Sequence, residues 1–364
     1  MSIIPARVGL QQRILPEYRA EFFDVLATSC LQGLSVFAGN PCPDEPVETA
    51  RTLSIAHYQR AVNLHILRGK AYFYYQLGLL IWLARWQPQA LVIETNPRNL
   101  SNWLAINWMH HRHRPVIGWG LGVSSSNPLA SWIQHRILNR LDAVIAYSNT
   151  AKQQYIDAGI RPERVFVAAN AVTRRPSNQP LERPAEFKDG IPTLLFVGRL
   201  QPRKRVDVLL QALAVLPTAE QPNLVIVGDG PDRSRLEQLA WSIYPKAVFA
   251  GAKYGTELEP YYQDADLFVL PGTGGLAVQQ AMAHTLPVIV GEADGTQSEL
   301  VRSENGWMLP DPTPQTLTRI IQDALSDLSR LRRMGLASYR IVSEEVNIES
   351  MVDTFVRALR AVLR

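Results

Sequence analysis

Short, continuously apolar runs alternate with segments of helical periodicity along this chain. The clearest runs are TLLFV at Thr193–Val197 and NLVIV at Asn223–Val227, and a glycine directly follows each. Strands that are apolar on both faces are typical of parallel sheets covered by helices on each side. The alternation therefore predicts an α/β fold, and a hydrophobic fraction of 46% over 364 residues supplies core material for about two domains.

The same pattern predicts further elements in both halves of the chain. Strands are expected at Leu34–Ala38, Ala90–Glu94, Val116–Trp119, Ala143–Ala146, Val165–Ala168, Ala247–Ala250, Leu267–Leu270 and Pro287–Val290. Helices are expected at Tyr18–Ala27, Ala71–Arg85, Leu100–Arg112, Thr150–Ala158, Asp207–Leu216, Ser234–Trp241 and Ala277–His284. The tail, Asn347–Leu363, carries apolar residues at helical spacing and predicts a last helix.

A proline-rich segment, Thr173–Pro192, separates the two alternating halves. It holds four prolines and few apolar residues, which favours a linker. We therefore expect two Rossmann-like domains, each a doubly wound parallel sheet, that face a cleft. Their predicted bounds are 1–172 for the first domain, 173–192 for the linker and 193–340 for the second domain, followed by residues 341–364 as a C-terminal helix.

Basic residues directly follow the strand at Thr193–Val197, in the string GRLQPRK that begins at Gly198. Ligands of doubly wound sheets bind at the carboxyl ends of the strands. Gly198 permits a tight turn, while Arg199 and Lys204 offer a forked and a mobile cation for phosphate oxygens. This strand end therefore predicts a binding site for an anion.

A glycine-rich turn, PGTGGL, leads from the strand ending at Leu270 into the next helix. Bare backbone N–H groups and the helix dipole favour an anion at such a turn. Gln280 is expected on the helix face nearest Gly272, because eight residues make just over two turns. The candidate anion-binding residues of the turn and its helix are Thr273, Gly274, Gly275, Leu276 and Gln280.

Five strings of the second half together resemble a known family. In chain order they are VGRLQPRKRVDVLLQA, NLVIVGDGP, ADLFVLPG, GLAVQQAMAHTLPVI and SELVRSENGWMLP, between Thr193 and Pro310. They are similar to the retaining glycosyltransferases of glycosyltransferase family 4, which have the GT-B fold. The first half resembles this family more loosely, through VAANAV at Val167–Val172.

The resemblance implies a hexosyltransferase of glycan or glycolipid biosynthesis, whose second domain binds a nucleoside diphosphate sugar and whose first domain holds the acceptor. Arg199 and Lys204 match the basic pair that contacts the diphosphate and are the predicted catalytic residues. Gly275 and Leu276 match the backbone that meets the donor phosphates and sugar. Cations and amides that neutralise the leaving diphosphate predict a reaction without a metal or other cofactor. The family's C-terminal helix crosses back to the first domain, and we expect the same of the tail.

Three positions depart from the family's pattern. The family usually carries two glutamates at the positions of Gly272 and Gln280, which contact the donor sugar and the ribose. Trp119 stands where a histidine is often found. These departures leave two other functions open: a non-catalytic partner subunit that binds a nucleotide sugar, and another GT-B enzyme such as a sugar-nucleotide epimerase.

Polar residues at two strand ends of the first half are candidates for the acceptor site. The first group, Pro16–Arg19, follows a strand expected before Pro16 and opens a helix, and the second, Glu94–Arg98, lies at the end of the strand Ala90–Glu94. Each group reads equally well as ordinary loop polarity. The candidates are Tyr18, Arg19, Glu94, Asn96 and Arg98. The histidines at positions 110, 111 and 113 lack cysteine or carboxylate partners at ligand spacing, so we expect a solvated helix end there.

Positive charge is concentrated in the first half of the chain. Residues 1–180 carry 18 Lys and Arg against 10 Asp and Glu, although the whole chain has a net charge of only +4. The sequence contains no cluster of lysines with interleaved aromatic residues, so a nucleic acid is the least expected partner. We expect a glycan, lipid-linked or small-molecule acceptor and a cytoplasmic protein that can contact an anionic membrane at its inner face. Arg68–Arg85 is the candidate contact segment, and a buried core helix is the alternative there.

Overall fold

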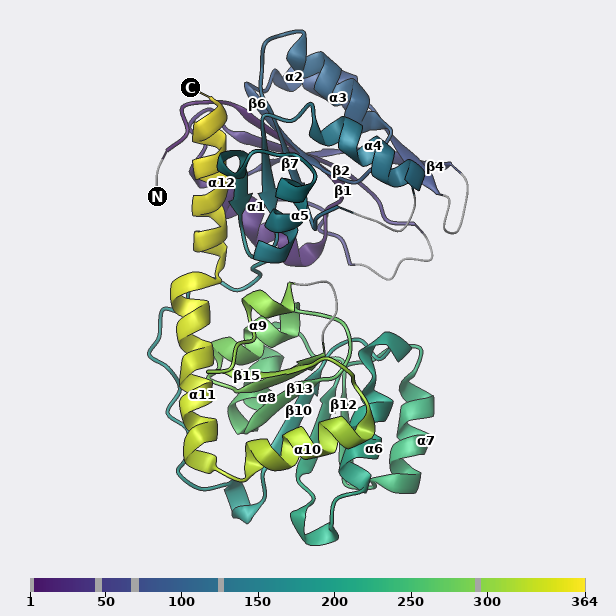
Figure 1. Cartoon of the computed structure of the whole chain (residues 1–364), viewed down its shortest axis with the longest axis vertical. Coiled ribbons are helices and arrows are strands. Elements are labelled where there is room, and N and C mark those ends of the chain that lie inside the picture. Colours follow the sequence, from purple (N-terminus) through teal and green to yellow (C-terminus); the bar gives the residue numbers. More distant parts are fainter. Residues whose placement is uncertain (1–2, 43–47, 67–71, 124–127, 292–295, 364) are drawn as a thin grey trace. The chain divides into compact units, whose positions relative to one another are not determined.

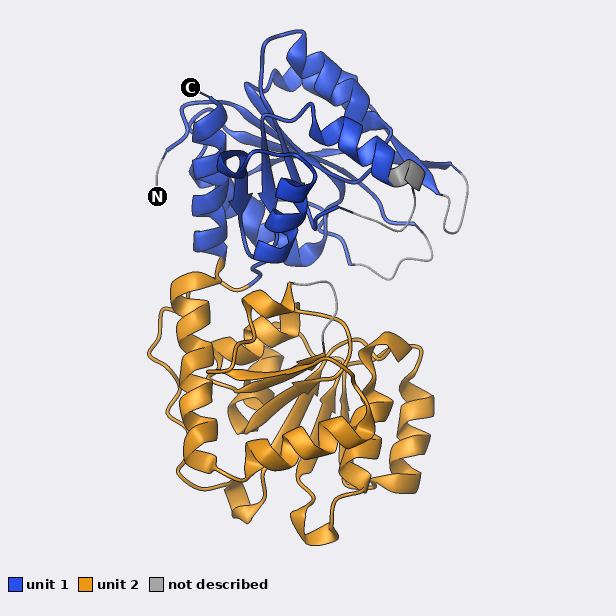
Figure 2. Cartoon of the chain, viewed as in Figure 1, with its two compact units in different colours: residues 1–172, 348–364 blue, residues 173–347 orange. Residues whose placement is uncertain are grey.

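The computed structural model describes residues 3–42, 48–66, 72–123, 128–291 and 296–363, and it divides into two compact units. Unit 1 comprises residues 1–172 and 348–364, and unit 2 comprises residues 173–347 (Figure 2). Both are Rossmann-like parallel sheets with helices on each face (Figure 1), as the alternation predicted. Among the described residues, no helix combines the length and the apolarity that crossing a bilayer requires.

Unit 1 is built on a seven-stranded parallel sheet with the order β3-β2-β1-β6-β7-β8-β9. Its strands are β1 (Val8–Ile14), β2 (Leu34–Gly39), β3 (His57–Arg60), β6 (Ala90–Glu94), β7 (Val116–Gly120), β8 (Ala143–Ala146) and β9 (Val165–Val167). A separate antiparallel pair is formed by β4 (Val62–Ile66) and β5 (Phe73–Leu77). Its helices are α1 (Ala20–Thr28), α2 (Leu79–Trp86), α3 (Ser101–His110), α4 (Pro128–Leu138), α5 (Asn149–Asp157) and α12 (Ile348–Val362).

Two apolar cores cover the two faces of this sheet. One core brings α1 and α12 together, and its centre is the aromatic cluster of Phe22, Trp119 and Phe355, whose ring centroids lie 4.9–5.7 Å apart. The other core is formed by residues of α2, α3, α4 and α5. The last helix of the chain therefore packs within unit 1, and its apolar stripe is buried there.

Unit 2 is built on a six-stranded parallel sheet with the order β12-β11-β10-β13-β14-β15. Its strands are β10 (Thr193–Val197), β11 (Asn223–Val227), β12 (Ala247–Gly251), β13 (Leu267–Leu270), β14 (Val288–Gly291) and β15 (Gly306–Leu309). Its helices are α6 (Val206–Ala214), α7 (Arg233–Ile243), α8 (Glu259–Asp264), α9 (Leu276–Ala283), α10 (Pro314–Leu325) and α11 (Leu328–Arg340). Helix α6 packs against α7 and α10, whereas α9 packs against α11.

The expectation of a single helix over Ala71–Arg85 was wrong. Phe73–Leu77 is the strand β5, and the helix α2 begins only at Leu79, after Gly78 in a left-handed conformation with φ 87°. Residues 67–71, which include the predicted helix start, lie outside the described residues. The FYYQL sequence alternates apolar and polar residues with a period of two, and this is the periodicity of a strand.

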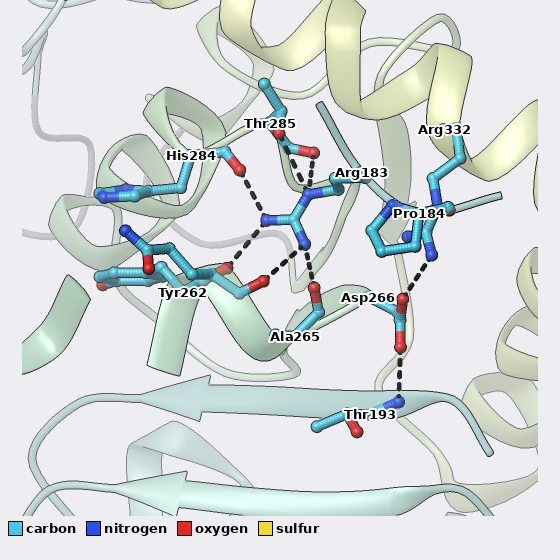
Figure 3. Close-up of polar contacts among 10 residues, drawn as sticks. Arg183, Pro184, Thr193, Tyr262, Ala265, Asp266, His284, Thr285 and Arg332 are labelled. Carbon is cyan, nitrogen blue, oxygen red and sulfur yellow. Dashed lines mark hydrogen bonds and ion pairs between the residues drawn. The ribbon is translucent and has the colours of Figure 1, made fainter. Parts of the chain in front are cut away.

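The segment predicted as a linker groups with unit 2, because Arg183 is bound to it by six hydrogen bonds (Figure 3). Its guanidinium donates to the carbonyls of Tyr262 (2.8 Å), Gln263 (3.3 Å), His284 (2.6 Å) and Ala265, and to the carbonyl and hydroxyl of Thr285 (3.0 and 3.1 Å). These carbonyls lie at the C-terminal ends of α8 and α9, where a cation also interacts favourably with the helix dipole.

A buried ion pair lies beside this anchor. Arg332 of α11 donates to Asp266 at 2.7 Å and to the Pro184 carbonyl at 2.9 Å, and Asp266 also accepts from the Thr193 backbone at 2.9 Å. Burial and the nearby Arg332 charge lower the pKa of Arg183 to about 10, although Asp266 opposes the shift. The guanidinium stays charged at neutral pH. The Arg183 guanidinium therefore holds the C-terminal ends of α8 and α9 to the segment 173–192.

The bounds of the tail also differ from the sequence prediction. Residues 341–347 group with unit 2, because a π-helical turn, Ile341–Glu345, continues α11 before α12 begins at Ile348. The chain passes between the units twice, at residues 172–173 and at residues 347–348. Gln279 of α9 contacts both places: its amide nitrogen donates to the Val346 carbonyl at 2.5 Å, and its oxygen accepts from the Thr173 backbone at 3.2 Å. One side chain therefore binds both segments through which the chain passes between the units.

Candidate active site

Glycine backbones pack against one another at the carboxyl edge of the unit 2 sheet. Gly198, which follows β10, donates to the Val227 carbonyl at 3.0 Å, and the Thr273 N–H donates to the Arg203 carbonyl at 3.1 Å. A β-carbon at Gly230 would overlap the carbonyl oxygen of Leu200. Only glycine fits so close a backbone contact, so the backbones of these loops pack directly against one another.

The Lys204 side chain lies against the glycine-rich loop, Gly272–Gly275. Its ammonium group donates to the Thr273 carbonyl at 2.6 Å. A β-carbon at Gly274 would overlap the same ammonium, and one at Gly198 would lie 3.8 Å from Lys204 Cε. Burial, with a smaller contribution from the Arg203 charge, lowers the pKa of Lys204 to about 8. The structure thus brings Gly198, Lys204, Thr273 and Gly274 together around one partly desolvated cation.

Helix α9 begins directly behind this cation. Its N-cap residue is Gly275, which makes no side-chain capping bond, and Leu276 is the first helical residue. A β-carbon at Gly275 would meet nothing within 4 Å. The Thr273 hydroxyl is buried and has no hydrogen-bond partner among the described residues. Helix N–H groups, an unpaired hydroxyl and an ammonium therefore belong to one short loop and its contact with Lys204, and donors of this kind suit an anion.

The other two donor-side candidates are placed differently. Arg199 is exposed, and among the described residues its guanidinium has no ion pair, although its charge helps to lower the pKa of Asp229. Gln280 is half-buried in the second turn of α9, and its amide oxygen accepts from the Tyr262 hydroxyl at 3.3 Å. Tyr262 in turn stacks on His284, with ring centroids 4.9 Å apart. The amide nitrogen of Gln280 is the group left to donate to a ligand.

The structure explains why position 272 carries glycine. A β-carbon there would lie 2.6 Å from the backbone of Lys204, because the turn at Pro202–Lys204 is pressed against it. No side chain fits without a shift of that turn. A glutamate, which the family usually carries at this position, would therefore clash with the loop that carries Lys204.

The Gly272→Ala substitution is expected to lower the free energy of unfolding by about 1–3 kcal/mol, because overpacking displaces the Lys204 turn. Gly275→Ala is the matched control for the fold, since its β-carbon meets open space and its expected change is within about 0.5 kcal/mol. Both should weaken binding of a nucleoside diphosphate. Thermal unfolding and calorimetry separate the two effects, and equal stability of both variants would contradict the close packing at position 272.

Sequence reasoning missed Gln297, which also contacts the glycine loop. This buried residue follows β14 and donates from its amide nitrogen to the Gly274 carbonyl at 3.3 Å. The only signal available in the sequence was its position after the strand at Val288–Gly291, which ends at the same edge of the sheet. Gln297 and Lys204 therefore hold the adjacent carbonyls of Gly274 and Thr273.

The carboxyl edge of the unit 1 sheet brings Arg19 and Glu94 into electrostatic contact. Glu94 ends β6, and its carboxylate accepts from the Tyr74 hydroxyl at 3.3 Å. Desolvation raises the pKa of Glu94, and the backbone N–H and charge of Arg13 chiefly oppose this rise, with a smaller effect from Arg19. A carboxyl group shifted in this way, at a strand end, suits a role in hydrogen bonding or proton transfer with a ligand.

Arg19 is only 4% exposed and lies among aromatic rings. Its guanidinium carbon lies 5.0–5.6 Å from the ring centroids of Tyr18, Trp119 and Tyr147, and it donates to the Tyr147 hydroxyl at 3.3 Å. The Trp119 indole N–H is buried and has no partner among the described residues. Tyr18, by contrast, is 44% exposed.

The remaining two acceptor candidates stabilise a loop. The Asn96 side chain accepts from the Arg98 backbone at 3.0 Å, and the Arg98 guanidinium stacks over Tyr72 with 4.6 Å to the ring centroid. Arg13, Tyr74 and Tyr147 complete the group around Glu94 and were not predicted. Tyr147 directly follows the strand Ala143–Ala146, so its position at a strand end was an available signal. Among the described residues, no group of three or more His, Cys, Asp or Glu side chains could hold a metal ion.

Two family models match the chain in order. The model "Glycosyl transferase 4-like domain" matches residues 13–171, and "Glycosyl transferases group 1" matches residues 178–340. A GDP-mannose-dependent α-mannosyltransferase of Mycobacterium tuberculosis is 39% identical over 188 residues, which are 50% of this chain and 47% of the relative. Its counterpart from Mycolicibacterium smegmatis is 33% identical over 237 residues, or 62% and 58%. The chain thus spans about half the length of these curated relatives.

Solved structures share the fold over nearly the whole chain. The Anabaena protein HepE, solved in complex with UDP, superposes with a TM-score of 0.71 and covers 99% of this chain and 100% of its own, at 16% identity. The outer-core galactosyltransferase WaaB superposes with a TM-score of 0.72, covering 99% of each chain at 15% identity. From the two matched domains in order and this shared architecture, the chain belongs to the glycosyltransferases of the group 1 and 4-like domain pair, with the GT-B fold.

Proposed function

We propose that this protein transfers a hexosyl group from a nucleoside diphosphate sugar to an acceptor hydroxyl. The observation that carries the proposal is the partly buried Lys204 ammonium, which contacts the Thr273–Gly274 backbone just before the N-terminus of α9. A diphosphate there would receive hydrogen bonds from Lys204, from the backbone of Gly275 and Leu276, and from the Thr273 hydroxyl. Arg199 would supply a second positive charge from solvent.

In the proposed reaction, the acceptor oxygen bonds to the anomeric carbon while the bond to the diphosphate oxygen breaks. The diphosphate leaves with the electron pair, and the proton of the acceptor hydroxyl passes to the departing diphosphate oxygen. Preorganised cations and amides lower the barrier because they face the charge as it develops on the leaving group. We further propose that the configuration is retained and that no metal is needed, since this chain's own donors neutralise the diphosphate.

The proposed donor is GDP-mannose, because the two similar curated relatives are named GDP-mannose-dependent. HepE was solved with UDP, and a uridine diphosphate sugar is therefore the second candidate. For the acceptor we propose a glycan, a lipid-linked sugar or a small polyol held in unit 1 around Arg19 and Glu94. The Glu94 carboxylate and the Tyr74 hydroxyl would hydrogen-bond the acceptor hydroxyls.

A panel of nucleoside diphosphate sugars tests this proposal. Calorimetry should show binding of one donor, and a coupled assay should show slow release of its nucleoside diphosphate in water, with faster release when an acceptor is supplied. Binding with no release under any acceptor would favour the non-catalytic partner subunit, for which the closed space at Gly272 is the supporting observation. Failure of every donor and nucleotide to bind would refute both functions.

A further inference from the structure

The β4–β5 hairpin of unit 1 exposes its apolar face and buries its polar face. The antiparallel register pairs Val62 with Leu77, Leu64 with Tyr75 and Ile66 with Phe73, so these six side chains share one face. Val62, Leu64, Ile66 and Leu77 are 58%, 45%, 45% and 43% exposed. An ordinary half-buried strand has the opposite arrangement. We refer to these six residues as the outer face of the hairpin.

Polar contacts fix this orientation from the other side. Gln76 is fully buried, donates to the Gln12 carbonyl at 3.0 Å and accepts from Gln11 at 2.8 Å. Asn63 donates to the Arg13 carbonyl at 2.8 Å, and Tyr74 donates to Glu94. Turning the hairpin over would bury six apolar groups but leave these buried polar groups without partners. The apolar outer face is therefore a consequence of the inner contacts, which also help to form the candidate acceptor site.

The hairpin belongs to a strongly basic stretch of the chain, and two arginines lie beside it. Residues 49–141 contain ten Arg and Lys and a single acidic residue, Glu94. Glu94 is turned inward to Tyr74, so it does not balance these charges at the surface. Arg60 precedes the hairpin by two residues and is exposed, and Arg98 stacks on Tyr72 beside β5. Apolar side chains combined with tyrosines and basic residues are the composition that proteins present to the interface of an anionic bilayer.

We propose that the outer face of the hairpin docks onto the surface of a membrane containing anionic phospholipids. The headgroup region would take up the outer face of the hairpin, while Arg60 and Arg98 would attract the lipid phosphates. The proposal deepens the proposed function, because the same hairpin's inner face contributes Tyr74 to the candidate acceptor site. An acceptor attached to a lipid would then meet Glu94 at the membrane surface.

Sedimentation with vesicles tests the docking surface in the full-length protein. Phosphatidylcholine vesicles are compared with vesicles that also contain phosphatidylglycerol, at low and high salt. We expect binding to the anionic vesicles, weakened by salt because the headgroup attraction is screened. The double substitution Val62→Thr/Leu64→Thr should reduce the partition coefficient roughly tenfold, since it removes apolar contact from two exposed side chains yet retains strand propensity.

Leu31→Thr is the matched control. Leu31 is also an exposed apolar residue of unit 1, at 72%, but it precedes β2 and therefore lies at the amino edge of the sheet. It should leave vesicle binding unchanged, and all three proteins should share one melting temperature. Absence of binding, or equal loss in the control, overturns the proposal. So does a wild-type dimer that becomes monomeric on Val62→Thr/Leu64→Thr without vesicle binding, since the face would then be covered by a second copy.

Nucleoside diphosphate binding, measured by calorimetry on the same samples, separates this proposal from the proposed function. The donor groups lie in unit 2, so hairpin variants should bind nucleotide as the wild type does. Vesicle binding without nucleotide binding would refute the proposed function alone. Nucleotide binding without vesicle binding would refute the membrane surface alone.

Discussion

Replacing Lys204 with methionine is expected to slow sugar transfer by a factor of about 100 to 1000, which corresponds to about 2.7–4 kcal/mol of transition-state stabilisation. Lys204 is partly buried against the glycine-rich loop, where it donates to the Thr273 carbonyl at 2.6 Å, and its charge would face the departing diphosphate. Methionine fills a similar volume without charge, so the fold should persist. The measurement is kcat with saturating donor, together with calorimetric diphosphate affinity.

Arg203→Met is the control for this loss, because it removes one positive charge from the same turn. The Arg203 side chain bonds to Gln201 at 2.9 Å and is exposed. We expect less than about a threefold effect at neutral pH, in line with the small contribution of exposed charges. Equal losses in the two variants would show that only the net charge of the turn matters and would contradict a specific role of Lys204.

The pH dependence should carry the signature of Lys204. Because the pKa of Lys204 is about 8, its side chain in the free protein is a fully charged ammonium only well below that pH. A bound diphosphate favours the protonated ammonium, so affinity should be greatest below pH 8 and fall as the pH rises above it. The Lys204→Arg variant, which stays charged, should flatten this fall. An unchanged slope in that variant would assign the titration to another group.

Replacing Arg183 with methionine is expected to lower the free energy of unfolding of unit 2 by about 3 kcal/mol. The substitution removes six hydrogen bonds to a charged donor and leaves the carbonyls at the ends of α8 and α9 without it. Hydrogen exchange should rise in α8 and α9 first. Because α9 carries the glycine loop at its other end, nucleotide affinity should fall as well.

Arg319→Met is the matched control for the anchor. Arg319 is an exposed residue of α10 in the same unit, and its substitution should change stability by no more than about 0.5 kcal/mol. Urea unfolding of the full chain, combined with exchange in peptides of unit 2, measures both variants. An Arg183→Met protein with wild-type exchange in α8 and α9 would show that the six contacts contribute little.

The central strands of unit 2 could be predicted because burial on both faces leaves a direct record in the sequence, whereas the edge strand Gly306–Leu309, whose middle residues are only partly buried, was missed. Thr193–Val197, Asn223–Val227 and Leu267–Leu270 are strands with the predicted bounds. The glycine loop could be predicted for the same reason, since few other residues tolerate the backbone contacts at a crowded sheet edge. The reason for a glycine at position 272 could not be predicted, because it depends on the contact between this residue and the backbone of the turn Pro202–Lys204.

Two other features were hidden from sequence reasoning. The β5 strand alternates correctly for a strand, but its apolar residues face outward and continue into the apolar start of α2, so the whole stretch resembles one helix. Arg183 stands in a segment whose prolines predict an extended linker, and nothing local in the sequence indicates that distant carbonyls will gather around it. Both depend on long-range contacts.

The discontinuity of unit 1 has a consequence for synthesis on the ribosome. Residues 173–347 form unit 2 without interruption, so this unit can fold as soon as it has emerged. Unit 1 is begun first but needs α12, whose Phe355 closes the aromatic cluster with Phe22 and Trp119. Until residues 348–362 are made, α1 alone covers that face of the sheet, and the apolar residues that α12 contacts stay open. The nascent chain therefore completes its earlier-translated half last, and chaperones have that interval in which to bind it.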